Sequence, residues 1–95
     1  MSQQTLASLN LEAILERLLL PDKSQISPVE ARYFLRLKFS DSDSRRMRAL
    51  SAKAKQGVLR DEEDEALENY IRAGHLLGIL QSRARRVLKS ARDNS

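Results

Sequence analysis

Six carboxylates lie within one stretch of eight residues, and they are the side chains here with the clearest capacity for chemistry. They are Asp61, Glu62, Glu63, Asp64, Glu65 and Glu68. Such a cluster could hold a divalent cation or a basic partner. The glycine-bearing twelve-residue pattern of a calcium loop is missing, however, and the dipole of a helix stabilises carboxylates in its first turn. We therefore expect this stretch to begin a helix.

The last part of the chain carries the opposite charge. Its candidate contacts for a nucleic acid or an acidic partner are Arg83, Arg85, Arg86 and Lys89. Cationic side chains bind phosphates, but they also suit the C-terminal end of a helix. No aromatic residue, on which unpaired bases could stack, occurs in this segment. The pattern therefore indicates either a charged contact surface or a solvated helix end.

The other residue types argue against catalysis. The chain has no cysteine and only one histidine, His75, so it offers neither a thiolate nucleophile nor a histidine-rich metal site. The clustered carboxylates belong to a solvated turn, not to an apolar cleft that would raise the pKa of one of them. Three glycines are too few for a phosphate-binding loop. We expect no catalytic residue, no metal and no cofactor, and predict that the protein is not an enzyme.

Length and composition predict one small domain over residues 1–95, with residues 1–5 and 92–95 frayed. The chain is 41% hydrophobic and 32% charged, with a net charge of +4. The hydrophobic fraction is too high for a wholly disordered chain, and the charged fraction is too high for a membrane span. No run of 18 apolar residues and no signal-peptide pattern is present. We expect a cytoplasmic protein.

Apolar residues recur at helical spacing in four segments, which predicts an all-α fold of about four helices, three short ones packed along a long C-terminal helix. The first helix should stop at Pro21, and Ser27 with Glu30 should form a capping box at the start of the second. The side chains predicted to face the core are Leu6, Leu9, Ala13, Ile14, Leu18 and Leu20 in the first helix, and Val29, Tyr33, Phe34 and Leu37 in the second.

The third and fourth helices have similarly clear local signals. Ser40 with Asp43 is a plausible cap for the third helix, and Gly57 is a natural left-handed stop. The fourth helix should cover residues 61–91. The inward side chains expected in the third helix are Met47, Ala49, Leu50 and Ala54.

The long fourth helix is predicted to self-associate. Gly74 and Gly78 fall on one ridge, where small residues let another helix approach closely, although a helix of the same chain could also fill that ridge. An antiparallel two-fold dimer would place the acidic start of one copy near the basic end of the other. The residues predicted to form this dimer or partner interface are Leu67, Ile71, Gly74, Leu77, Gly78 and Gln81.

Five short strings resemble a family of small uncharacterised bacterial helical proteins that are found beside HNH-type endonuclease genes. The strings are Leu18-Leu19-Leu20-Pro21, Ser27-Pro28-Val29-Glu30-Ala31-Arg32, the segment 50–57, the segment 67–72 and the segment 80–85. The chain departs from the family pattern at Arg60-Asp61, where related chains carry Thr-Pro, and its first residues have no counterpart. The resemblance implies an arrangement similar to toxin–antitoxin or nuclease–partner pairs, with no catalytic residues in this chain.

Two functions follow as hypotheses. The first is a non-catalytic helical interaction protein, the partner or antitoxin-like component of a nuclease pair. Because a DNA nuclease is usually basic, residues 61–68 would then make the contact. The alternative is a small basic nucleic-acid-binding protein that uses the basic residues of segments 32–55 and 83–92, and its affinity should fall steeply with salt.

Overall fold

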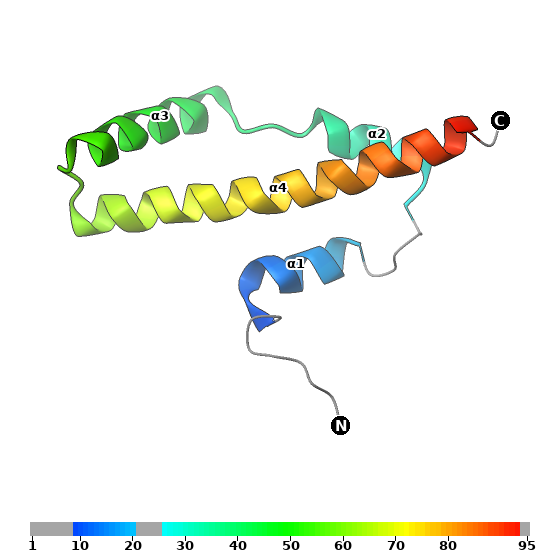
Figure 1. Ribbon diagram of the computed structural model, residues 1–95, viewed down its shortest axis with the longest axis horizontal. Helices are drawn as coiled ribbons and strands as arrows, with labels where there is room; N and C mark the ends of the chain where they lie inside the picture. Colours follow the sequence, from blue (N-terminus) through cyan, green and yellow to red (C-terminus); the bar gives the residue numbers. More distant parts are fainter. Residues whose placement is uncertain (1–8, 21–25, 94–95) are drawn as a thin grey trace. The chain divides into compact units, whose positions relative to one another are not determined.

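The computed structural model describes residues 9–20 and 26–93, and within these ranges it contains four α-helices and no strand (Figure 1). The helices are α1 (Leu11–Leu19), α2 (Pro28–Arg36), α3 (Asp41–Gln56) and α4 (Asp61–Asp93). The predicted all-α fold, with short helices packed against a long C-terminal one, is therefore confirmed. Leu6, Pro21, residues 1–5 and residues 94–95 lie outside the described residues. Of the segment 92–95 that was predicted to be frayed, Arg92 and Asp93 belong to α4.

The helices form two compact units that share α4. Unit one contains α1, α2 and the part of α4 from His75 onward. Unit two is Lys38–Gly74, in which α3 and the first part of α4 form an antiparallel hairpin (Figure 1). The same long helix therefore contributes to two separate sets of contacts.

Side-chain caps begin the first three helices. The Ser27 hydroxyl accepts a hydrogen bond from the Glu30 amide at 3.1 Å, while the Ser27 amide donates to Glu30 Oε1 at 2.8 Å, so the predicted capping box is present. Ser40 likewise accepts from the Asp43 amide at 3.1 Å, as predicted. Asn10, at which no cap was predicted, accepts from the Ala13 amide and begins α1. Each cap satisfies an amide that would otherwise lack a partner.

The predicted stop at Gly57 reverses the chain between α3 and α4. Gly57 is left-handed, with φ of 72°, and its amide donates to the Ala54 carbonyl at 3.1 Å. The Val58 amide donates to the Lys53 carbonyl, also at 3.1 Å. These two bonds form a Schellman motif, in which glycine is preferred because it has no Cβ to clash in this conformation.

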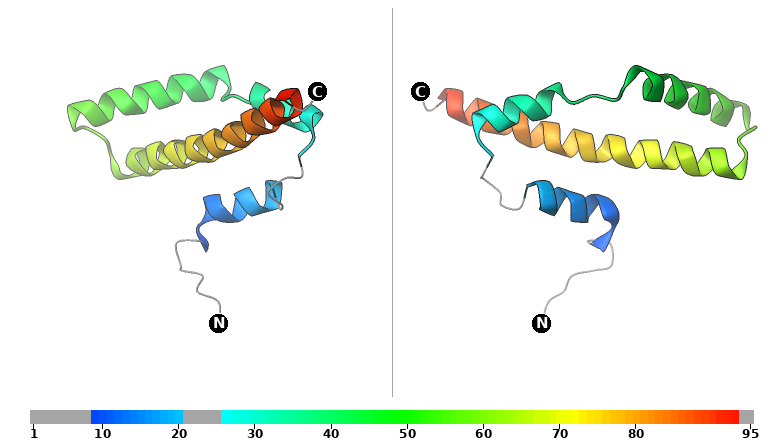
Figure 2. Two further views of the ribbon diagram at one scale, coloured as in Figure 1. Left: turned by 45° about the vertical axis from the view of Figure 1, so that its right-hand side comes forward. Right: turned by 180° about the vertical axis from the view of Figure 1, so that it is seen from behind.

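The core of unit one is small. Among its described residues, those that are buried are Leu20, Ala31, Leu80 and Ala84, and both alanines are completely inaccessible. Figure 2 shows α2 lying against the C-terminal part of α4, the two helices that carry these alanines. Small side chains at such a crossing let two helix axes approach closely.

Several core predictions for unit one were wrong. In α2, Val29 is 68% exposed and Tyr33 is 55% exposed, while Ala31 is the buried residue. Leu9, Ile14 and Leu18 were also expected inside, but they are exposed at the surface of α1 and its N-terminal flank. The apolar period showed that each helix has an apolar face. It could not show that a small residue beside that face would make the closest approach.

Unit two has no buried residue at all. Between Lys38 and Gly74 every side chain is half-buried or exposed. Met47 and Leu50 are half-buried, as two helices allow, whereas Ala49 and Ala54 are exposed against expectation. Two packed helices can cover only the narrow stripe between them, so a hairpin leaves the flanks of that stripe open.

Candidate protein interface

A groove runs along one side of the hairpin in unit two. It has a volume of about 310 Å³ and a floor of apolar side chains. A second hollow, which shares Ala66 with it, continues along α4 past Asn69 and Tyr70 to Ala73. The residues that line the groove are Arg46, Ala49, Leu50, Lys53, Glu62, Glu63 and Ala66.

The two walls of this groove differ in charge. The α3 wall presents Arg46 and Lys53, and the α4 wall presents Glu62 and Glu63. The whole helices repeat this contrast, because α3 has five basic residues against two acidic ones, while residues 61–74 have six acidic residues and one arginine. The groove is therefore apolar at its floor and oppositely charged at its two edges.

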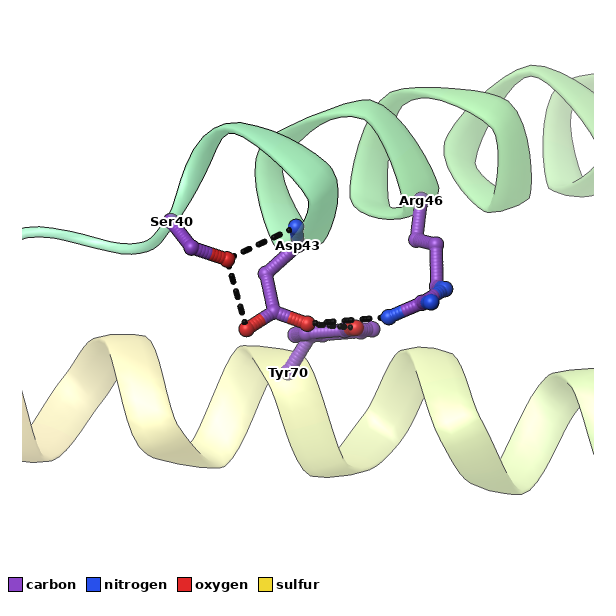
Figure 3. Close-up of polar contacts among 4 residues, drawn as sticks. All are labelled: Ser40, Asp43, Arg46 and Tyr70. Atoms are coloured by element: carbon purple, nitrogen blue, oxygen red, sulfur yellow. Dashed lines mark hydrogen bonds and ion pairs between the residues drawn. The ribbon is translucent and has the colours of Figure 1, made fainter.

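A polar cluster joins α3 to α4 in the same unit (Figure 3). The Tyr70 hydroxyl donates to Asp43 Oδ1 at 2.5 Å, Ser40 donates to Asp43 Oδ2 at 3.2 Å, and Arg46 donates to Oδ1 at 3.3 Å. The Tyr70 hydroxyl, followed by Ser40 and Arg46, lowers the pKa of Asp43 below its ordinary value. The Tyr70 ring also meets Phe39 edge-on, with 6.1 Å between ring centroids. Asp43 is therefore both a helix-cap residue and the acceptor of the tertiary contact.

Glu63 closes the other end of the hairpin. Lys53 Nζ donates to Glu63 Oε2 at 2.5 Å, and the Arg60 amide donates to Oε1 at 3.0 Å. The hydrogen bond from Lys53, with the bond from the Arg60 backbone, lowers the pKa of Glu63 to about 2. This one member of the acidic cluster thus begins α4 and also binds α3.

The other five carboxylates of the cluster point to solvent. Asp61, Glu62, Asp64, Glu65 and Glu68 are all exposed. Across the described ranges, no group of three or more histidines and carboxylates is arranged to hold a metal ion. His75 is exposed on α4. What these five residues offer is negative surface charge at the start of a helix.

The predicted interface on α4 is divided between covered and open positions. Leu67, Gly74 and Leu77 are half-buried, whereas Ile71 is 51% exposed and Gly78 is exposed. No described atom lies within 4 Å of where a Cβ would sit on Gly74 or Gly78. None of the helices that the structure describes therefore packs onto these two glycines.

Gln81, the sixth residue of that prediction, has a role within unit one. Its Nε2 donates to the carbonyls of Phe34 at 3.1 Å and Leu37 at 2.9 Å. These carbonyls lie at the end of α2, where the last carbonyls have no amide four residues on in the helix. The Phe34 carbonyl also accepts from the Leu37 amide at 3.2 Å. The signal for this contact in the sequence is that Gln81 is a polar residue within an otherwise apolar stripe.

The basic candidates at the end of α4 are not equivalent. Arg83 is half-buried and its NH1 lies 3.5 Å from Glu16 Oε2, so it links α4 to α1 within unit one. Arg85, Arg86 and Lys89 are exposed. Of the four candidates, these three therefore lie at the surface, where a phosphate group could reach them.

Unit one also exposes large apolar side chains. Leu18 is 69% exposed and Leu11 is 63% exposed on α1, and Val29 and Tyr33 are open on α2. Seven of the ten exposed large apolar residues that the structure describes belong to α1, α2 and the N-terminal flank of α1. They are Leu9, Leu11, Ile14, Leu18, Leu19, Val29 and Tyr33.

Comparisons with protein families, curated proteins and solved structures found no match for this chain. No helix within the described ranges combines the length and the apolar character that crossing a membrane would need. The case for function therefore depends on the surfaces themselves.

Proposed function

We propose that the protein is a non-catalytic helical interaction protein that acts in the cytoplasm and binds a protein partner. The observation that carries this proposal is the exposed apolar surface of α1 and α2, which holds more large apolar side chains than the buried core of unit one. Exposed apolar residues that are this concentrated are typical of interaction surfaces. A protein partner that covered this surface would remove these side chains from water.

The proposed partner is an HNH-type nuclease, in an antitoxin-like or nuclease–partner pair. This part of the proposal comes from the resemblance of the sequence strings, together with the five exposed carboxylates near the start of α4. A nuclease that binds DNA presents a basic surface, and an acidic helix start would attract it. Apolar contact would supply affinity, and the carboxylates would accelerate and orient the encounter.

The experiment is a pull-down against the product of the neighbouring nuclease gene, with the intact chain as bait. Leu18→Glu places a charge in the apolar surface at a site that is 69% exposed, so folding should survive while capture is lost. Val58→Glu is the matched control, because Val58 is 55% exposed but belongs to unit two. Equal capture by both variants would contradict the proposed surface.

A second candidate function is nucleic-acid binding through the exposed Arg85, Arg86 and Lys89. Binding to a DNA duplex should be measured at two salt concentrations, with Lys89→Glu as the variant. A steep loss of affinity with salt, no protein partner captured and weaker binding by the variant would favour this alternative.

The proposed function also includes the formation of a homodimer by this protein.

A further inference from the structure

We propose that the groove of unit two is filled by the same hairpin of a second copy, which gives a four-helix bundle of two α3 helices and two α4 segments. The proposal specifies the homodimer of the proposed function and rests on it, but it does not depend on the nuclease partner. It commits to one arrangement, in which α3 of each copy lies on α4 of the other.

The first argument is the lack of a core in this unit. No residue from Lys38 to Gly74 is buried, although α3 has 16 residues and the hairpin is tied by caps and ion pairs. Isolated helices of about this length are marginal in water, and most helical stability comes from apolar packing. Half-buried Leu50 and Ala66 lie in the floor of the open groove, so a second pair of helices would complete their burial.

The second argument is the shape of the groove. Its floor includes Ala49 on α3 and Ala66 on α4, and the adjoining hollow reaches Ala73 on the same helix. Alanines at these positions allow neighbouring helix axes to approach to about 8–10 Å, as in four-helix bundles. The helices of a second hairpin could therefore pack closely against the part of α3 and α4 that lines this groove.

The third argument is charge, and it selects both the occupant and its orientation. A second copy carries the same basic helix and the same acidic helix, so α3 of one copy can face α4 of the other. This requires a two-fold axis parallel to the helices. An axis across the helices would set α3 on α3 and bring like charges together. The favoured arrangement also makes every pair of neighbouring helices antiparallel, which suits their dipoles.

Two substitutions separate this dimer from the antiparallel α4 dimer expected from the sequence. Ala73→Arg places a charge in the hollow that adjoins the groove, whereas Ile71→Arg places a charge in the other predicted interface. Both positions are exposed, so the helix should form in both variants. Mass should be measured by light scattering over a range of concentrations, with helicity checked by circular dichroism. We expect a wild-type dimer that Ile71→Arg leaves intact and Ala73→Arg weakens by at least about tenfold. Loss with Ile71→Arg alone, or a wild-type monomer at every concentration, would overturn the proposal.

Cross-linking tests the orientation, and the natural lack of cysteine makes it simple. Ala49 and Ala66 line the same cavity, so the proposed axis places Ala49 of one copy opposite Ala66 of the other. A mixture of the Ala49→Cys and Ala66→Cys chains should form a disulfide-linked dimer, while either chain alone should not, because diagonal helices exceed the Cα separation of about 7 Å that a disulfide spans. Efficient cross-linking of Ala49→Cys alone would mean that α3 lies on α3, and would overturn the arrangement.

The nuclease pull-down distinguishes failure of this inference from failure of the proposed function. Ala73→Arg should still capture the nuclease through α1 and α2, whereas Leu18→Glu should remain a dimer and fail to capture it. Loss of capture by Ala73→Arg in a chain of normal helicity would show that the nuclease, and not a second copy, occupies this face of the hairpin.

Discussion

The two units of this protein use the same long helix but are stabilised in different ways. Unit one buries Leu20, Ala31, Leu80 and Ala84, and its polar contacts include Gln81 at the end of α2 and the Glu16–Arg83 pair. Unit two has half-buried residues but no fully buried one, and its helices are joined by Asp43 with Tyr70 and by Glu63 with Lys53. Burial is non-directional and tolerates repacking, whereas hydrogen bonds and ion pairs fix register. In unit two the register of the two helices is thus defined by polar contacts, although no side chain between them is fully buried.

The largest effect is expected from a substitution that creates a cavity in the core of unit one. Leu80→Ala should destabilise unit one by about 2–5 kcal/mol, because it removes most of one of the few buried side chains. Chemical denaturation followed by circular dichroism would measure the change. Ile79→Ala is the matched control, since Ile79 is 38% exposed, and it should cost far less. Similar losses for both variants would mean that the small core does not hold this unit together.

The same substitution at two glycines should have opposite effects. Gly57→Ala should cost about 1–2 kcal/mol, because alanine is strained in the left-handed conformation that ends α3. Gly78→Ala should instead stabilise α4 by about 1 kcal/mol, since glycine disfavours a helix interior and nothing described lies near the added methyl group. Thermal unfolding of both variants would measure this. A destabilising Gly78→Ala would indicate that the ridge is occupied by another chain.

Loss of the α2 cap should have a smaller effect, confined to unit one. Ser27→Ala removes the acceptor of the Glu30 amide and should cost about 1 kcal/mol. Amide hydrogen exchange should show faster opening of α2 while the α3 amides keep their protection. Ser40→Ala is the reciprocal variant in unit two, and it should loosen α3 instead. Uniform acceleration in both variants would mean that the units do not open separately.

The smallest expected effect is the pH response of unit two. The pKa of Glu63 is lowered to about 2 from an ordinary value of 4.5, and that of Asp43 is lowered as well. A carboxyl group whose pKa falls on folding stabilises the folded state fully above its unfolded pKa. The contribution is lost as pH falls from about 4.5 to about 2.

Thermal midpoints at several pH values in this window should therefore decline more in the wild type than in Glu63→Gln, which has no proton to gain. Both groups are near the surface, so the difference should be modest and should shrink with added salt. Identical pH profiles for the two proteins would show that the Glu63 contacts add nothing to folding.

Local signals in the sequence predicted the four helices and most of their ends. Ser27 with Glu30, Ser40 with Asp43, and Gly57 each act within a few residues, so their effect does not depend on the rest of the fold. The acidic cluster likewise begins α4. Each of these depends on residue type and spacing alone.

Only the tertiary structure decided which faces are covered and which polar groups meet. It turned Ala31 inward and left Val29 and Tyr33 open, and it brought Tyr70 to Asp43 over a separation of 27 residues. The groove of unit two depends on the same kind of information, because its walls come from two helices whose relative rotation no local pattern encodes. The sequence by itself determined the helices, their ends and their charges. The choice between adjacent apolar stripes was left to packing, because it depends on how closely two helices can approach and not on the period of either one.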